Sequence, residues 1–466
     1  MQPVTLDDLI NACQGTAIGI SNLQASFDRV EIDSRLVRSG DVFWAIVGKR
    51  DDGHRYIRQA LDRGAVACVV EQERLGDHRE RLIAVEETVL ALWDFAEWYR
   101  NQFDPLVIGV TGTVGKTTTR HMLHTVLSAK YFGVESPGNF NNHLGVPLSL
   151  LQLGPDHEFA ALELGASQTG EIEDLASIAH PEIGVITAIT PVHLDEFQTM
   201  EAILQAKGEL LEALPKSGFA VLNGDDQLVR QLAERASCPV IFVGEDTRND
   251  LIAQWVRVEN GWLRFAVEAA EFDVPVVGRH HLISAMAAVA VGRQVDMTDE
   301  EIAAGLRMFE PISGRSELLR IGPWVVINDT YNASPASMKA ACQVLQDWTG
   351  ANKKILIAGD MLALGSQSGQ FHKELGSQIA HSGVHRLVAV GSQAASIAGS
   401  AKEQGMDAGC LGVCGTTDLA RLLIDCWLEP GDVVLVKGSR DLQMEQFVAY
   451  LESLAKRQSE PVARAA

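Results

Sequence analysis

The chain has 466 residues, of which 46% are hydrophobic and 21% are charged, and its formal net charge is −22 at pH 7. This length accommodates about three domains, and the hydrophobic share is that of a globular protein with large buried cores. The strong negative charge argues against a nucleic-acid-binding protein, because nucleic-acid binding requires a basic surface.

The sequence also predicts a cytoplasmic protein without a membrane span. The first residues, "MQPVTLDDLI", are acidic and lack the basic and apolar segments of a secretory signal. The longest stretch without a charge, residues 136–155, is full of Asn, Gly and Pro, so we do not expect it to cross a membrane. The seven cysteines, an odd number without a Cys-x-x-Cys pair, are typical of free thiols in a reducing compartment.

The first segment of the chain, to about residue 100, has strand-like runs at 29–33, 41–47 and 65–70, and helices are expected at 54–63 and 88–103. Between Arg35 and Arg63, seven Lys or Arg against four Asp or Glu give a local charge of +3 in a very acidic chain. A solvated helix face explains this excess, and so does a pocket for a polyanion such as a diphosphate. Both interpretations stay open.

A glycine-rich loop, "GVTGTVGKTTTR" at 109–120, follows a short β-branched run and precedes a stretch with helical spacing of apolar residues. A strand, a glycine loop and a helix in that order direct backbone N–H groups at an anion. The loop departs from the usual phosphate-loop pattern, because Val110 stands where a glycine is expected. We still expect Lys116 to bind nucleotide phosphates and Thr117 to ligate Mg²⁺.

The second segment, to about residue 313, alternates strands and helices and therefore predicts an α/β domain with a parallel sheet. Ligands bind beyond the carboxyl ends of such strands. Two candidate residues lie there: Glu163 ends the run "FAALELG", and His193 follows the run "IGVITAIT". Glu163 suits a hard cation, whereas the imidazole of His193 suits Mn²⁺ better than Mg²⁺. Each residue alone is also explained as solvated surface.

Lys207 occupies an unusual position for a lysine. The stretch 199–214 predicts a helix, and Lys207 falls inside its apolar stripe of Ile203, Leu210 and Leu214. It either extends its amine to solvent, pairs with Glu209 or Glu212, or is a desolvated and reactive amine. The spacing leaves these alternatives open.

The third segment, from about residue 314, repeats strand–helix units that begin at 324–331, 354–360, 386–391 and 433–438. This pattern predicts a small doubly wound domain. The fold class is therefore α/β with three domains: an N-terminal domain at 1–102, a central phosphate-loop domain at 103–313, and a C-terminal Rossmann-like domain at 314–466.

Several motifs in this chain occur in the same order in one known family. They are "TGTVGKTT", "NFNNHLGVP", "ELGASQTGEI", "QAKGEL", "SGRSE", "NDTYNASPASM" and "GDMLALG". The chain resembles the Mur ligases, which build the peptide of bacterial cell-wall precursors, and the likeness covers nearly its whole length. It is most similar to members that add D-alanyl-D-alanine to UDP-N-acetylmuramoyl-tripeptide. The stretch 33–54 resembles the family's UDP-binding N-terminal module.

The resemblance implies roles for particular residues. The phosphate loop would hold ATP and Mg²⁺ through Gly112, Thr113, Gly115, Lys116, Thr117 and Thr118. A second Mg²⁺ would be held by Glu163 and His193, and Lys207 would match a family lysine that is carbamylated in several members. Asn141 and Asn142 would lie near the muramoyl group, and Ser34 and Arg35 near the uridine diphosphate. From the third domain, the residues closing on the nucleotide would be Arg315, Asp329, Tyr331 and Asn332.

His281 departs from the family pattern. It ends the motif "GRHH", where the family has an asparagine that contacts adenine. A histidine offers one donor or acceptor in place of the paired groups of an amide, so this adenine contact stays open.

The reaction implied by the resemblance is amide formation through an acyl phosphate, with Lys116, Lys207 and His193 as the catalytic residues. We expect a monomer that uses ATP and Mg²⁺, and the third residue of the tripeptide, diaminopimelate or lysine, stays open. One alternative is another ligase of this superfamily, tripeptide-forming or folylpolyglutamate synthase-like; the latter would not need a UDP-binding module. A nucleotide-switch ATPase would explain the loop alone.

Overall fold

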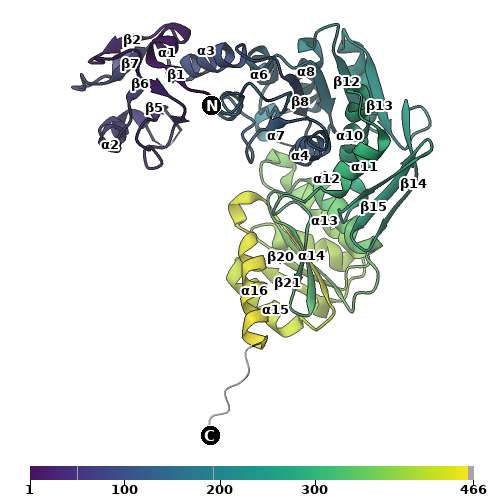
Figure 1. The fold of residues 1–466 in the computed structure, drawn as a ribbon. Coiled ribbons are helices and arrows are strands. Elements are labelled where there is room, and N and C mark those ends of the chain that lie inside the picture. Colours follow the sequence, from purple (N-terminus) through teal and green to yellow (C-terminus); the bar gives the residue numbers. More distant parts are fainter. Residues whose placement is uncertain (50, 193, 460–466) are drawn as a thin grey trace.

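The computed structural model describes residues 1–49, 51–192 and 194–459, and it confirms the three-domain α/β fold (Figure 1). Each domain is built around its own sheet, of five, nine or six strands. Within the described ranges, no helix is both long and apolar enough to cross a membrane.

The N-terminal domain is a five-stranded sheet that is parallel except for one edge strand. In sheet order its strands are β2 (Thr16–Ile18), β7 (Leu82–Val85), β6 (Ala67–Glu71), β5 (Val42–Trp44) and β4 (Val30–Glu31), with β2 antiparallel to β7. The other elements are β1 (Val4–Thr5), paired with β3 (Ser26–Phe27), α1 (Leu6–Ala12), η1 (Gly53–Tyr56), α2 (Ile57–Asp62), η2 (Gln72–Arg74) and α3 (Thr88–Arg100). The helix predicted at 54–63 is thus formed by η1 and α2, and α3 is the expected connecting helix.

The central domain has a nine-stranded sheet with an antiparallel extension. In sheet order its strands are β16 (Ala270–Val274), β15 (Trp262–Val267), β14 (Leu251–Glu259), β13 (Val240–Gly244), β12 (Phe219–Asn223), β11 (Ile183–Ile186), β8 (Leu106–Thr111), β10 (Phe159–Glu163) and β9 (Gly133–Glu135). Strands β14, β15 and β16 form the antiparallel part, which the sequence analysis did not predict.

Helices cover both faces of the central sheet. They are α4 (Lys116–Leu127), α5 (Gly145–Leu150), α6 (Glu171–Ala179), α7 (Leu194–Phe197), α8 (Met200–Ala213), α9 (Gln227–Leu232), η3 (Ala233–Arg235), η4 (Arg279–His281), α10 (Leu282–Gln294) and α11 (Asp299–Arg307). On one face, Val107 and Leu162 pack with α5, α6 and α8, and on the other Ile108 and Val185 pack with α4, α10 and α11. Burial on both faces explains why these strands are continuously apolar.

The C-terminal domain has a six-stranded sheet in which only β17 runs antiparallel. In sheet order its strands are β17 (Glu317–Ile321), β18 (Trp324–Asp329), β22 (Val433–Lys437), β19 (Lys354–Gly359), β20 (Arg386–Val390) and β21 (Leu411–Cys414). The helices are α12 (Pro335–Asp347), η5 (Gly365–Gln367), α13 (Ser368–His381), α14 (Ala394–Glu403), η6 (Ala408–Cys410), α15 (Thr417–Trp427), η7 (Arg440–Leu442) and α16 (Glu445–Ser459).

Two glycines allow helix α8 to approach the central sheet closely. Gly109 in β8 and Gly184 in β11 are direct neighbours in the sheet. A Cβ atom on Gly109 would lie 3.1 Å from Leu210 of α8, and one on Gly184 would lie 2.9 Å from Leu214. Because Lys207 lies one turn before Leu210 on the same helix, this close packing fixes the depth at which the lysine is held.

We predict that Gly184→Val displaces α8 from the sheet, because the two added methyl groups have no space there. The free energy of unfolding of the central domain should fall by about 1–3 kcal/mol, measured by urea denaturation. Gly399→Ala is the control, because Gly399 lies at an exposed position of α14 and a Cβ atom there would have no other atom within 4 Å, so this change should not lower stability. Equal stability of Gly184→Val and the wild type would contradict this account of the packing.

Candidate active site

A cleft of about 700 Å³ lies between the central and C-terminal domains. The central domain lines it with the loop before α4, the carboxyl ends of β10 and β11, and η4. The C-terminal domain lines it with the carboxyl ends of β18 and β22, the loop after β19, and the start of α12. The binding edges of both parallel sheets therefore face one space, which is where open sheets of this kind bind their ligands.

The loop before α4 has the backbone of an anion-binding loop. Gly115 is the N-cap of α4 in a left-handed conformation, with φ of 85°, and Gly112 has φ of 139°. A Cβ atom on Gly112 would lie 2.1 Å from Thr187 Oγ1, so only glycine fits there. The Lys116 amine donates to the Gly112 carbonyl at 3.0 Å and therefore lies over the loop. The first residues of α4, Lys116 to Thr118, line the cleft, so the N-terminus of this helix is placed where it can bind a phosphate.

Glu163 connects the loop to the neighbouring strand. Its carboxylate accepts hydrogen bonds from the Thr117 hydroxyl at 2.6 Å and from the Asn141 amide at 2.7 Å. The side chain ends β10 and is only 2% exposed. A buried carboxylate and a hydroxyl at a phosphate loop form a set of hard oxygen donors that suits Mg²⁺.

Lys207 is buried, at 2% exposure, so its amine does not extend to solvent. Its amine donates to the Ala166 carbonyl at 3.3 Å and lies 5.5 Å from the centre of the Phe197 ring. Burial, together with the positive charge of Lys116, lowers the pKa of Lys207 to about 7, although Glu171, Glu209 and Glu163 act in the opposite direction. The lowered pKa favours the neutral, nucleophilic form of the Lys207 amine over the ammonium form of an ordinary lysine.

The carboxylates proposed as partners of Lys207 have other roles. Glu209 accepts from the backbone N–H groups of Gly170, Ile172 and Glu173, at 2.7 to 3.2 Å, and so caps the N-terminus of α6. Glu212 pairs with Arg235 at 2.7 Å. Of the three alternatives for Lys207, the desolvated amine is the one that this geometry favours.

The C-terminal domain contributes a cation-rich wall. The guanidinium of Arg315 lies 4.0 Å from the centre of the Tyr331 ring, and Arg440 approaches the same ring. Asp329 pairs with Lys437 at 2.7 Å, and Lys437 also donates to the Asn332 carbonyl at 2.9 Å. Lys437 and Arg440 were not predicted from the sequence. The sequence does contain a feature that could have indicated Lys437: it ends the apolar run 433–437, which is an unusual place for a charged residue.

His281 lies at the cleft wall on η4 and is 6% exposed. Burial, with the neighbouring His280 adding to it, holds the pKa of His281 well below its ordinary value, so the ring is neutral at neutral pH. Its Nε2 has no hydrogen-bond partner among the described residues. A buried polar atom without a partner is costly, so a ligand group that bonds to it would be stabilised.

The remaining predicted site residues are not all in the cleft. Asn141 lines it, whereas the Asn142 side chain accepts from the N–H of Gly145 at 2.9 Å, at the start of α5. In the N-terminal domain, Ser34 is buried and donates to Gln59 at 2.7 Å, and Arg35 is exposed and pairs with Asp33. The prediction for His193 lies outside the described residues.

The fold and the cleft are those of a nucleotide-binding enzyme in which a phosphate loop faces a second α/β domain. Three family models match the chain in order: the Mur ligase family catalytic domain over residues 26–101, the Mur ligase middle domain over 110–292, and the Mur ligase glutamate ligase domain over 314–440. The chain is 35% identical to the UDP-N-acetylmuramoyl-tripeptide--D-alanyl-D-alanine ligase of Bacillus subtilis, over 95% of this chain and 97% of that protein. The chain belongs to the Mur ligase family.

Solved structures agree with this family. The fold is similar to that of MurF from Acinetobacter baumannii, with a TM-score of 0.88 and 32% identity over 97% of this chain and 99% of that chain. It is also similar to MurF ligase from Thermotoga maritima in complex with ADP, with a TM-score of 0.81 and 29% identity over 92% of this chain and 98% of that chain.

We predict that Lys207→Met is more stable than the wild type at pH 6 by about 2–4 kcal/mol, although it loses activity. The lysine has a pKa of about 7 when folded and 10.5 when free. Between these values the unfolded chain keeps a proton that the folded protein has released, so wild-type stability rises with pH through this window. Below pH 7 Lys207 is charged in the folded protein as well, so burial of the ammonium ion lowers the free energy of unfolding of the wild type by its full amount.

The measurement is urea denaturation at pH 6 and pH 9 in buffers purged of CO₂. The advantage of Lys207→Met should shrink at pH 9, while Lys402→Met, at an exposed lysine on α14, should match the wild type at both pH values. An advantage that is absent, or the same at both pH values, would show that the amine is not desolvated.

Proposed function

We propose that this chain is an ATP-dependent ligase that joins D-alanyl-D-alanine to UDP-N-acetylmuramoyl-tripeptide, a step in the synthesis of the peptidoglycan precursor. The observation that carries this proposal is the cleft itself, in which a phosphate loop with its Lys116 and the buried carboxylate of Glu163 face a second domain. Similarity over nearly the full length to proteins of this name supports the choice of substrate.

ATP would bind with its phosphates on the loop from Gly112 to Thr118, at the N-terminus of α4. Lys116 and Arg315 both contribute positive charge to the cleft. Burial is the main cause that lowers the pKa of Lys116; Glu163 acts in the opposite direction, and repulsion from Arg315 lowers the pKa further. A triphosphate relieves this repulsion, which supports its binding here. The adenine would lie toward His281, whose Nε2 lacks a partner among the described residues.

Mg²⁺ fits the oxygen donors beside the loop. The Thr117 hydroxyl and Glu163 would hold it, and Glu163 would exchange its neutral hydrogen-bond donors for the ion. When bound, Mg²⁺ supplies charge neutralisation for phosphate oxygens. His193, which lies outside the described residues, is proposed as a further ligand on the family resemblance alone.

The reaction would proceed in two displacements. The terminal carboxylate of the tripeptide attacks the γ-phosphorus of ATP, and ADP leaves with the electron pair of the broken bond. The amine of D-alanyl-D-alanine then attacks the acyl carbon, phosphate leaves, and the amine proton passes to solvent. The charge on the transferring phosphoryl group would be stabilised by Lys116 and Arg315, which line the same cleft.

The acyl phosphate must be kept from water, and contact between the two domains serves this purpose. The Leu194 N–H at the start of α7 donates to the Ala363 carbonyl of the C-terminal domain at 3.1 Å. Leu362, Ala363 and Leu364 line the cleft from that side. This bond joins the loop after β19 to the helix whose Phe197 covers Lys207.

Lys207 would act as a carbamate. A neutral amine adds to CO₂ and loses one proton, which yields an N-linked carboxylate. The low pKa of Lys207 supports this step, because the neutral amine is already populated at pH 7. The product carries a negative charge among Lys116 and the proposed Mg²⁺, where the free ammonium ion would be repelled.

The uridine diphosphate would bind to the N-terminal domain, near Ser34 and Arg35, with Asn141 and Asn142 near the muramoyl group. With the uridine diphosphate on the N-terminal domain and ATP between the other two domains, we place the domain boundaries at residues 102/103 and 313/314. We place the enzyme in the cytoplasm as a monomer; its seven free cysteines are consistent with a reducing compartment. A folylpolyglutamate synthase-like ligase or a nucleotide switch would leave the N-terminal domain without a role.

The test is an omission assay. Phosphate release is measured with ATP, Mg²⁺, UDP-N-acetylmuramoyl-tripeptide and D-alanyl-D-alanine, and then with each component left out. The tripeptide is supplied in its diaminopimelate and lysine forms. Release should require all four components, since the acyl phosphate turns over only when an amine accepts the acyl group. Folate with glutamate should give no release.

The Lys116→Met variant is tested in the same assay. Its rate of phosphate release should be lower by about 100-fold or more, because Lys116 is proposed to contact only the nucleotide phosphates. For the same reason the variant should bind UDP-N-acetylmuramoyl-tripeptide like the wild type. Lys216→Met, at an exposed lysine of the same domain, is the control. Normal turnover by Lys116→Met, or phosphate release without an amine acceptor, would rule out the proposed reaction.

A further inference from the structure

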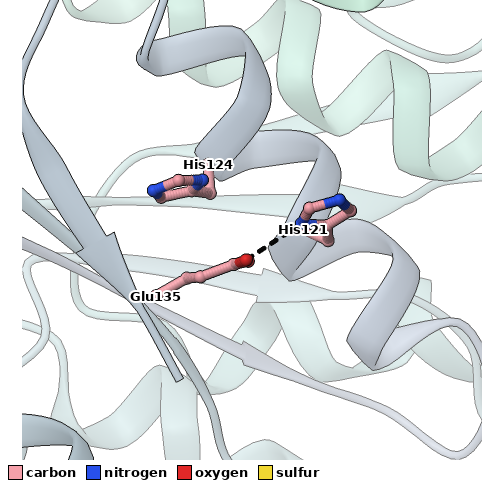
Figure 2. A group of neighbouring side chains, drawn as sticks. All are labelled: His121, His124 and Glu135. Carbon is pink, nitrogen blue, oxygen red and sulfur yellow. Dashed lines mark hydrogen bonds and ion pairs between the residues drawn. The ribbon is translucent and has the colours of Figure 1, made fainter. Parts of the chain in front are cut away.

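A second group of side chains that could ligate a metal lies on helix α4, which follows the phosphate loop, and on strand β9. His121 and His124 project from α4 toward Glu135, the last residue of edge strand β9 (Figure 2). One potential ligand atom from each of the three residues lies within 4.8 Å of the others, and His121 Nδ1 is 2.9 Å from Glu135 Oε1. All three side chains are half-buried and lie outside the cleft lining.

The fold holds the two imidazoles on one side of α4. Residues three apart on a helix are neighbours on its surface, so His121 and His124 face the same strand. Each ring lies against an aromatic side chain: His121 is 5.4 Å from Phe309, and His124 is 5.7 Å from Phe159, measured between ring centres. This packing restricts the rings before any ligand arrives, which lowers the cost of binding.

Buried polar atoms without a hydrogen bond around Glu135 give a second, independent observation. Arg120 is 2% exposed, and its Nη1 forms an ion pair with Glu135 Oε2 at 3.4 Å that is too poorly oriented for a hydrogen bond. Among the described residues, Glu135 Oε2 and the Arg120 Nε and Nη1 atoms have no hydrogen-bond partner. Buried polar groups in folded proteins are normally satisfied, so this arrangement is incomplete as it stands.

We propose that His121, His124 and Glu135 form a binding site for a transition-metal dication of the zinc type, separate from the nucleotide site. Two imidazoles and one carboxylate are a ligand set of Zn²⁺, with a fourth position left for water, whereas Mg²⁺ and Ca²⁺ prefer oxygen ligands. With Glu135 Oε1 on the metal, Oε2 would turn to Arg120, and a ligating carboxylate is commonly held by such a partner.

The site would join two elements on which the active site depends. Helix α4 begins at the phosphate loop, and Glu135 directly precedes Ser136, whose hydroxyl accepts from the Glu163 N–H at 3.1 Å. A metal between α4 and β9 would therefore fix the edge strand next to β10, the strand that carries Glu163. Its expected role is structural, and the test relies on metal binding rather than on ligase activity.

The experiment uses the full-length protein without a histidine tag, stripped of metal and kept in excess Mg²⁺ to fill oxygen-ligand sites. Co²⁺ is added as a spectroscopic probe, followed by competition with Zn²⁺. The wild type should bind one equivalent and show the visible absorption of four-coordinate Co²⁺, which Zn²⁺ then abolishes. His124→Gln and Glu135→Gln should each bind Zn²⁺ at least about 100-fold more weakly.

His180→Gln is the matched control, because this histidine belongs to the same domain and pairs with Glu97 at the surface. It should bind Zn²⁺ like the wild type. Zinc-edge anomalous scattering from wild-type crystals locates the ion without any variant, and so decides the matter if the variants do not fold. Absence of a stoichiometric Co²⁺ spectrum, unchanged affinity in both ligand variants, or an ion found elsewhere would overturn the proposal.

Discussion

The structure depends on keeping the Lys207 amine away from water while leaving it close to the phosphate loop. Gly109 and Gly184 let α8 approach the sheet, and Phe197 lies over the amine. Glu209, the nearest carboxylate in sequence, is occupied at the N-terminus of α6. A lysine held in this way costs stability, since burial opposes its charge, and such a cost is typical of functional residues.

The positive charges near the phosphate loop are concentrated in one place, although the chain has a net charge of −22. Lys116, Arg315, Lys437 and Arg440 line a single cleft between two domains, and Glu163 and Asp329 are fixed by hydrogen bonds to neighbouring groups. A polyanionic nucleotide is attracted to this cleft, whereas the rest of the acidic surface repels it. The cations that face this cleft come from both domains.

The sequence predicted the parts of this molecule that local patterns determine. The buried parallel strands are short apolar runs, and the phosphate loop lies between an apolar run and a stretch of helical spacing, which form β8 and α4. The antiparallel strands β14, β15 and β16 were missed, because they follow one another without helices between them, whereas the parallel units alternate strands and helices. Lys437 and the capping role of Glu209 were missed as well, since their partners Asp329 and Gly170 are distant in sequence and only tertiary packing unites them.

The central claim is that the cleft transfers a phosphoryl group to the carboxylate of the tripeptide. The most direct test labels both oxygens of that carboxylate with ¹⁸O and follows the label after turnover in ordinary water. The account predicts that the released phosphate carries one ¹⁸O atom per turnover, because this oxygen bridges carbon and phosphorus in the acyl phosphate. Phosphate without the label would contradict the account, since the carboxylate would then never have been phosphorylated.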